Sequence, residues 1–436
     1  MNTTLTRGAV ALAIGATVAL VAGCAPGAVE DDNASAAPVE TFDPADYAGE
    51  TLTYMYFTDG PDEAGTRALI ADFEKKYDVT VDLEILPYAD LVTSTLNRLS
   101  AGNAPDVARL TGLADFTGDL LPLEPYLGAD YRDQFLEGPV KGALDADDQL
   151  IAAPSDLTLN APFINVDLFE KAGVDVPEKW TWDELIEAGK EVKAKTGVEY
   201  AFAMDKSGNR LSTILSQYDT FLVDRQGATL DAKKGEKALQ PIVDMMLDGS
   251  MPADFWLGSG SRYKGANEIF LAGQTPIYLS GNWQVGQFIK NATFNWAVAP
   301  NPCATNCGGF PGGKFMAAFK DSKHPALAAE FVRFMNEKEN QATFLAAAGA
   351  LPTRADLTAD DIAYDAKAKE AMAQFLTDLD KTPKEGFAAN GSRFFSGAAT
   401  ALVDTVSAAV AGQTPLSTGM PDLVTKIEAL VDEQSQ

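Results

Sequence analysis

The side chains that could do chemistry in this chain are mainly acidic and aromatic. Its 436 residues include 62 aspartates and glutamates, 34 lysines and arginines, three cysteines and a single histidine, His324. Hydrolases that use a Ser-His-Asp or Cys-His arrangement need a histidine base, so one histidine argues against both. His324 stands before Pro325, where a helix is expected to start, and we interpret it as a solvated surface residue. Two carboxylates acting on a glycosidic bond have no signature spacing, so that chemistry stays open.

One glycine-rich segment has the spacing of a phosphate-binding loop. Gly308 to Lys314 fits Gly-x-x-x-x-Gly-Lys, but Phe315 stands where a serine or threonine would bind magnesium. No clear strand-to-helix turn surrounds it, so we reject a nucleotide site. The formal net charge of −28 also argues against nucleic acid and anionic lipid headgroups as direct partners, because like charges repel.

The amino terminus indicates export. Residues 8–22 carry no charge, and this run is shorter than the roughly 20 residues that span a bilayer. It ends in Val-Ala-Gly-Cys24, which resembles the bacterial lipobox, in which the cysteine is lipidated. We therefore predict a lipoprotein signal peptide over 1–23, lipidation of Cys24 and a flexible tether over 24–48, with an ordinary secretory signal as the alternative. The protein would be extracytoplasmic, anchored to the outer face of the cell membrane by lipid alone.

The two remaining cysteines suit an oxidising compartment. Cys303 and Cys307 lie close in the sequence, and a disulfide is the natural pairing outside the cytosol. A metal site is the alternative, but two cysteines and one histidine are too few ligands for a closed zinc site. We expect a disulfide, and no metal or cofactor.

The elements that must position these side chains form an α/β pattern. Residues 51–57, 79–85 and 107–110 are predicted strands, and apolar residues at helical spacing fill the two intervals. A β-α-β-α-β order implies a parallel sheet, whose ligand crevice lies beyond the carboxyl ends of the strands. Phe57, Asp59 and Arg109 lie at such ends.

A second α/β region follows. A helix is predicted over 182–196, where Thr181 and Glu184 form a capping box at its start. Helical spacing recurs over 239–247, 326–335, 366–379 and 398–410.

Four motifs follow one another along the chain. They are Leu99-Ser-Ala-Gly-Asn-Ala-Pro-Asp106-Val; Phe163-Ile-Asn-Val-Asp-Leu-Phe169 with Gly173 and Trp180-Thr-Trp-Asp-Glu-Leu185; Phe270 to Trp283; and Trp296 to Pro302 with Gly312-Gly313 and Gly349-Ala-Leu-Pro-Thr353. In this order they resemble the extracellular solute-binding proteins of the maltose-binding type, over nearly the whole mature chain. Asn282 departs from the pattern, because proline is common there.

The resemblance implies a fold and a function. The fold is α/β, with two discontinuous lobes around a ligand cleft, as in type II periplasmic binding proteins. Residues 49–155 and 314–350 would form one lobe, and residues 156–313 and 351–436 the other. The lobes would close by a hinge on a mono- or oligosaccharide, which a monomer would deliver to the permease subunits of an ABC importer without catalysis. A secreted glycan-active hydrolase and a receptor for a polyol or another solute are the alternatives.

The resemblance also implies the ligand contacts, since aromatic rings stack on sugars and charged groups bind their hydroxyls. The candidates are Phe57, Asp59, Arg109, Asp156, Thr158, Asn160, Asp205, Trp256, Asn282, Trp283, Gly309, Phe310, Arg393 and Phe394. Structural alternatives remain: core packing for Trp283, turn capping for Asp156, an ion pair for Arg109 and a simple hairpin for the glycine-rich loop. Trp180 and Trp182 we assign to core and helix packing.

Overall fold

The structure is a computed structural model that describes residues 40–258 and 265–434. Cys24 and the predicted signal peptide lie outside these residues. The described residues include part of the predicted tether, with a short 3-10 helix over Pro44–Tyr47. Phe42 stacks on Tyr47, with ring centroids 5.3 Å apart, and meets the edge of Tyr77. These aromatic contacts explain why this part of the tether is held to the folded chain.

The described residues contain one eight-stranded sheet. In order across it the strands are β2-β1-β3-β8-β4-β6-β5, and β7 pairs with β4. Their bounds are β1 (Thr51–Tyr56), β2 (Thr80–Ile85), β3 (Val107–Leu110), β4 (Ala153–Asn165), β5 (Ala203–Met204), β6 (Ile277–Gly281), β7 (Trp296–Val298) and β8 (Pro311–Ala318). β1 runs parallel to both β2 and β3. The predicted β-α-β-α-β unit with a parallel sheet is therefore confirmed.

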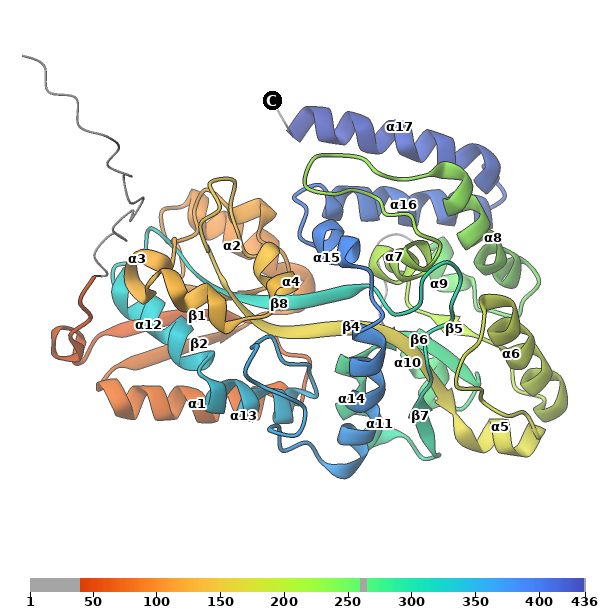
Figure 1. The fold of residues 1–436 in the computed structure, drawn as a ribbon, viewed down its shortest axis with the longest axis horizontal. Helices are drawn as coiled ribbons and strands as arrows, with labels where there is room; N and C mark the ends of the chain where they lie inside the picture. Colours follow the sequence, from red (N-terminus) through yellow and green to blue (C-terminus); the bar gives the residue numbers. More distant parts are fainter. Residues whose placement is uncertain (1–39, 259–264, 435–436) are drawn as a thin grey trace, which may run out of the picture. The chain divides into compact units, whose positions relative to one another are not determined.

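Two long strands connect this parallel part of the sheet to the rest. β4 and β8 pair antiparallel and run side by side, with Asp156 opposite Lys314 (Figure 1). β3 pairs with the other edge of β8, while β6 and β7 pair with the far end of β4. The predicted lobe boundaries after residues 155 and 313 fall inside β4 and β8. The boundary after residue 350 adjoins Leu351, which bridges to Leu157 of β4. The division into lobes stays a prediction, and its three boundaries meet at one place.

Helices cover the sheet in groups. They are α1 (Asp62–Tyr77), α2 (Leu91–Ser100), α3 (Glu124–Leu127), α4 (Glu137–Lys141), α5 (Val166–Ala172), α6 (Trp182–Thr196), α7 (Gly208–Gln217), α8 (Ala232–Leu247), α9 (Asp254–Leu257), α10 (Ala266–Leu271), α11 (Val285–Asn291), α12 (Pro325–Met335), α13 (Lys338–Ala348), α14 (Ala366–Leu379), α15 (Lys384–Asn390), α16 (Phe395–Val410) and α17 (Leu416–Gln434). α1, α12 and α13 pack together near β2 and β8, whereas α7, α8, α16 and α17 form a second cluster (Figure 1).

Local signals set several helix ends as predicted. The Thr181 hydroxyl accepts the Glu184 amide proton, and the Glu184 carboxylate accepts that of Thr181, so the capping box at the start of α6 is confirmed. α12 starts at Pro325, directly after His324. Within residues 40–258 and 265–434, no helix is both long enough and apolar enough to cross a membrane.

Candidate functional site

A buried cluster of charges lies where β3, β8 and β4 meet. The Arg109 guanidinium, only 2% exposed, donates to Asp62 (2.9 Å), Asp156 (3.2 Å) and Asp59 (3.3 Å) and to the carbonyl oxygen of Phe57 (2.7 Å). Its carbon also lies 4.6 Å from the centroid of the Phe57 ring. The structure thus shows Arg109 in the ion pairs that were the alternative to a ligand contact. The predicted strand-end residues Phe57, Asp59 and Arg109 are brought together with Asp156.

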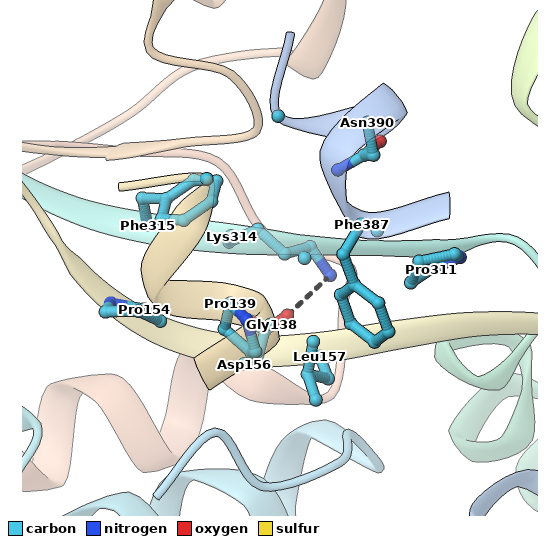
Figure 2. A pocket seen from close by; sticks show the side chains of 14 residues that line it. Gly138, Pro139, Pro154, Asp156, Leu157, Pro311, Lys314, Phe315, Phe387 and Asn390 are labelled. Atoms are coloured by element: carbon cyan, nitrogen blue, oxygen red, sulfur yellow. Dashed lines mark ion pairs between the residues drawn. The ribbon is translucent and has the colours of Figure 1, made fainter. Parts of the chain in front are cut away.

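Lys314 completes this charge cluster, which we define as Asp59, Asp62, Arg109, Asp156 and Lys314. Its ammonium lies 3.0 Å from Asp59 and 3.4 Å from Asp156. Figure 2 shows Lys314 on β8 and Asp156 on β4 pointing toward each other. Lys314 belongs to the segment with phosphate-loop spacing, and its position in a strand agrees with the rejection of a nucleotide site.

A small cavity adjoins the charge cluster. It is lined by residues of α4, β4, β8 and α15, including Asp156, Lys314 and Phe387 (Figure 2). Its volume of about 20 Å³ is room for about one water molecule. A sugar ring does not fit such a space, so a ligand could reach Asp156 through this cavity only if the cavity walls moved apart.

The charge cluster shifts the pKa values of Asp59 and Lys314. Burial alone would raise the pKa of Asp59, but Lys314 and Arg109 outweigh it, and the pKa lies below its ordinary value. Burial alone would lower the pKa of Lys314, but Asp156 and Asp59 raise it above the ordinary value. Asp59 keeps 23% of its side chain exposed, more than Asp62 or Asp156. It is therefore the carboxylate of the cluster that a ligand hydroxyl can reach first.

The lowered pKa of Asp59 predicts a pH dependence of stability. Because the carboxyl releases its proton more readily when folded, its contribution is fully present above the unfolded-state pKa of about 3.9. That contribution is lost as the pH falls through the lower folded-state value. We expect the free energy of unfolding, measured by denaturant titration between pH 5 and pH 3, to fall more steeply in the wild type than in Asp59→Asn. Parallel pH profiles of the two proteins would contradict this assignment.

Three predicted ligand residues form a row along one face of β4. Asp156, Thr158 and Asn160 occupy every second position of the strand, so their side chains project from the same face. Asn160 donates to the Asn209 side chain (2.7 Å) and to Thr213 (2.8 Å), both on α7. Its own amide oxygen is buried and has no hydrogen-bond partner among the described residues. We call Asp156, Thr158 and Asn160 the β4 polar row.

Glycines beside this row make room for neighbouring side chains. Gly312 on β8 lies opposite Thr158, and a Cβ there would come within 2.7 Å of the Thr158 hydroxyl. Gly281, at the end of β6, pairs with Asn160. Trp283 follows two residues later and is half-buried. Its ring lies over the Arg210 guanidinium, at 4.4 Å. The structure therefore places an aromatic ring close to the end of the β4 polar row.

The other predicted ligand residues have packing partners. The Asn282 side chain accepts from the Leu159 amide (2.9 Å) and donates to the carbonyls of Leu157 and Gly349. A Cβ at Gly309 would lie 2.4 Å from the Asn160 carbonyl oxygen. The side chains of Asp205, Trp256, Asn282, Phe310 and Phe394 are all at most 1% exposed, whereas Arg393 is exposed. Ligand contacts by the buried members stay predictions that require neighbouring elements to move.

Three residues of the site were not predicted from the sequence. Asp62 looks like an ordinary acidic residue in the first turn of a helix, and Arg210 like an ordinary helical arginine. Lys314 was considered only as part of the rejected loop. The available signal was a lysine inside an otherwise apolar strand, since lysine is almost never fully buried without a partner. Trp180 and Trp182 are buried, as assigned.

The Cys303 and Cys307 sulfurs are bonded in the structure. The loop between them is tied to α7, because the amide of Asn306 donates to the Gln217 carbonyl (2.9 Å). Closing a loop of about five residues contributes about 2 kcal/mol in the chain-entropy model. We expect Cys303→Ser/Cys307→Ser to lose about that much free energy of unfolding in denaturant titration. Two alkylatable thiols in the unreduced wild-type folded domain would contradict the pairing.

This chain is similar to several known proteins. The family model described as bacterial extracellular solute-binding protein matches residues 57–342. An arabinooligosaccharide-binding protein of Bacillus subtilis is 26% identical over 311 residues, which are 67% of this chain and 70% of that protein.

Two solved structures share the fold. The GacH receptor of Streptomyces glaucescens, solved unliganded and with acarbose, has a TM-score of 0.75 at 22% identity, covering 88% of this chain and 99% of that one. A substrate-binding protein of Listeria monocytogenes in complex with cycloalternan has a TM-score of 0.76 at 20% identity, with 87% and 98% covered. The predicted α/β fold of the periplasmic-binding-protein type is confirmed.

Proposed function

Since this chain belongs to the bacterial extracellular solute-binding proteins, we propose that it captures an oligosaccharide outside the cytoplasm and delivers it to the permease of an ABC importer. The observation that carries the proposal is the half-buried Trp283 ring close to the β4 polar row. The name of the Bacillus subtilis relative and the ligands of the two solved structures support the sugar class. We also propose that the protein acts as a monomer, with the indole and the β4 polar row of one chain forming the binding surface.

The Trp283 ring and the β4 polar row together suit the surface of a sugar. A sugar ring has apolar C–H faces, on which an indole can stack, and a rim of hydroxyl groups. Thr158 and Asn160 would bind hydroxyls, and Asp59 would accept from one in a charge-assisted hydrogen bond. Because the cavity at Asp156 has room for about one water, the ligand would enter an open form, and closure about β4 and β8 would follow.

The geometry favours binding over hydrolysis. A glycosidase needs one carboxyl group that stays protonated to act as the acid, and a second carboxylate opposite it. In the charge cluster each carboxylate faces Arg109 or Lys314, and the pKa of Asp59 is lowered. Asp59 is therefore poorly suited to donate a proton near neutral pH. We propose no catalytic step.

A ligand screen tests this function. A solute that binds only the folded state at 100 times its Kd raises the free energy of unfolding by about 2.7 kcal/mol. We expect thermal melts to shift upward with one class of oligosaccharide and not with glycerol phosphate or polyols. Samples of the same sugar, incubated at millimolar concentration, should stay intact. Sustained hydrolysis would instead support the glycan-active enzyme, and a shift with a polyol alone would support the other receptor class.

We also propose that the protein is a lipoprotein attached through Cys24, on the strength of the lipobox-like Val-Ala-Gly-Cys sequence. Cys24→Ser is expected to carry no metabolic lipid label and to appear in the medium, because the acyl chains would be the only anchor. The matched control is Cys303→Ser, which should keep its label. A labelled, membrane-bound Cys24→Ser protein would contradict the assignment.

A further inference from the structure

The position of the Trp283 ring depends on the absence of a side chain at residue 281. A Cβ at Gly281 would lie 1.8 Å from Cζ3 and 2.0 Å from Cη2 of the indole, far inside contact distance. The backbone there is extended, with φ −124°, which any residue can adopt. The requirement for glycine is therefore one of space alone: the ring occupies the volume that a side chain would fill.

A guanidinium group provides a second contact to the ring. Arg210, near the start of α7, places its guanidinium carbon 4.4 Å from the indole centroid. Its side chain is only 3% exposed. A planar cation at this distance is attracted to the ring face and stacks on it. Part of the indole nevertheless stays accessible, since Trp283 is half-buried.

Asp205 holds the guanidinium in place. Its Oδ2 accepts from Nη2 (2.8 Å) and Nε (3.1 Å) of Arg210. The same carboxylate accepts from the Tyr278 hydroxyl (2.7 Å) and the Ser280 hydroxyl (2.8 Å), and its side chain is fully buried. Tyr278 and Ser280 belong to β6, the strand that ends at Gly281. The contacts thus run from β6 through Asp205 and Arg210 to the indole, which lies against Gly281 at the end of the same strand.

From these contacts we infer that Asp205, Arg210 and Gly281 are positioning residues that hold the Trp283 indole for a sugar. The inference rests on the proposed function, because it gives the indole a ligand. It also assigns Asp205 a role through Arg210, in place of the direct ligand contact predicted from the sequence. Fixing the ring before the ligand arrives lowers the ordering cost of binding.

A double-variant experiment tests the inference. Gly281→Ala, Trp283→Ala and the double variant are titrated with the oligosaccharide that shifts the wild-type melt. We expect Gly281→Ala to raise Kd by about 5- to 150-fold, as removal of the indole does, and the double variant to bind no more weakly than Trp283→Ala. Gly118→Ala is the matched control, since a Cβ there meets no atom within 4 Å. Wild-type affinity in Gly281→Ala, or losses that multiply in the double variant, would overturn the inference.

A second readout does not depend on the sugar. The Trp283 contribution to the near-ultraviolet circular dichroism is taken as the difference between wild type and Trp283→Phe. It should change in Gly281→Ala while the far-ultraviolet spectrum stays the same; an unchanged contribution would overturn the inference. A wild type that binds no oligosaccharide would contradict the proposed function, and this spectrum would still decide the positioning role.

A milder variant keeps the test usable if Gly281→Ala does not fold. Arg210→Lys retains the charge beside Asp205 but loses the planar stack on the indole. Its Kd is expected to rise about 2- to 30-fold, the range of a cation–π contact. Its near-ultraviolet band should shift as well. Wild-type affinity together with a wild-type band would overturn the inference.

Discussion

Arg109→Met is expected to lower the free energy of unfolding by about 3–5 kcal/mol, the largest stability effect that we predict for a single substitution. Methionine preserves much of the length of the side chain but leaves Asp62 and Asp156 without the guanidinium group that pairs with both. Both carboxylates are fully buried, and removing one member of a buried ion pair leaves an uncompensated charge in a poorly polarisable environment. Lys314 contacts Asp156 but not Asp62, so it compensates only in part.

The measurement is denaturant unfolding of both proteins at neutral pH. Arg67→Met is the matched control, because Arg67 pairs with Glu63 on the exposed surface of α1. Exposed pairs of this kind contribute at most about 1 kcal/mol. If Arg109→Met were as stable as Arg67→Met, the buried pairs would not stabilise the fold, and Arg109 would be free for the ligand role predicted from the sequence.

Trp283→Ala is expected to raise the Kd for the oligosaccharide by about 5- to 150-fold. Burying an aromatic side chain and stacking it on a sugar together contribute about 1–3 kcal/mol, and 1.4 kcal/mol corresponds to a factor of ten. The melting temperature should fall less than after loss of a fully buried tryptophan, because the Trp283 ring is only half-buried.

Trp180 provides the opposite case. It is 1% exposed and its indole N–H donates to the Pro300 carbonyl at 2.7 Å. Trp180→Phe should lose stability and keep its affinity. Unchanged affinity of Trp283→Ala combined with a large loss of stability would show that Trp283 is a core residue, the structural alternative raised by the sequence.

Local patterns made much of the fold predictable. The strand at 107–110, the helix over 182–196 and the capping box at Thr181 depend on neighbours within a few residues, and each was found where expected. The parallel β1, β2 and β3 follow from chain connectivity, since helices separate them. The short helix over Pro44–Tyr47 was not predicted, because Tyr47 stacks on Phe42 and Phe42 in turn contacts a distant residue, Tyr77.

The site was harder to predict, because its contacts join residues far apart in the chain. Strand ends correctly brought Asp59 and Arg109 together, but nothing local to Lys314 indicates that Asp59 and Asp156 neutralise it. The buried Asp205 illustrates the same difficulty. Its four donors come from α7 and β6, so its role through Arg210 became visible only in three dimensions.

We propose that this chain binds an oligosaccharide reversibly and leaves it unchanged. Isothermal titration calorimetry of the wild-type protein with arabino-, chito- and malto-oligosaccharides tests it most directly. We predict saturable binding of one sugar molecule per chain for at least one series, with a negative heat-capacity change as the indole and the sugar face are buried. The absence of binding heat with every series, or a heat flow that continues after saturation because the sugar is being cleaved, would contradict it.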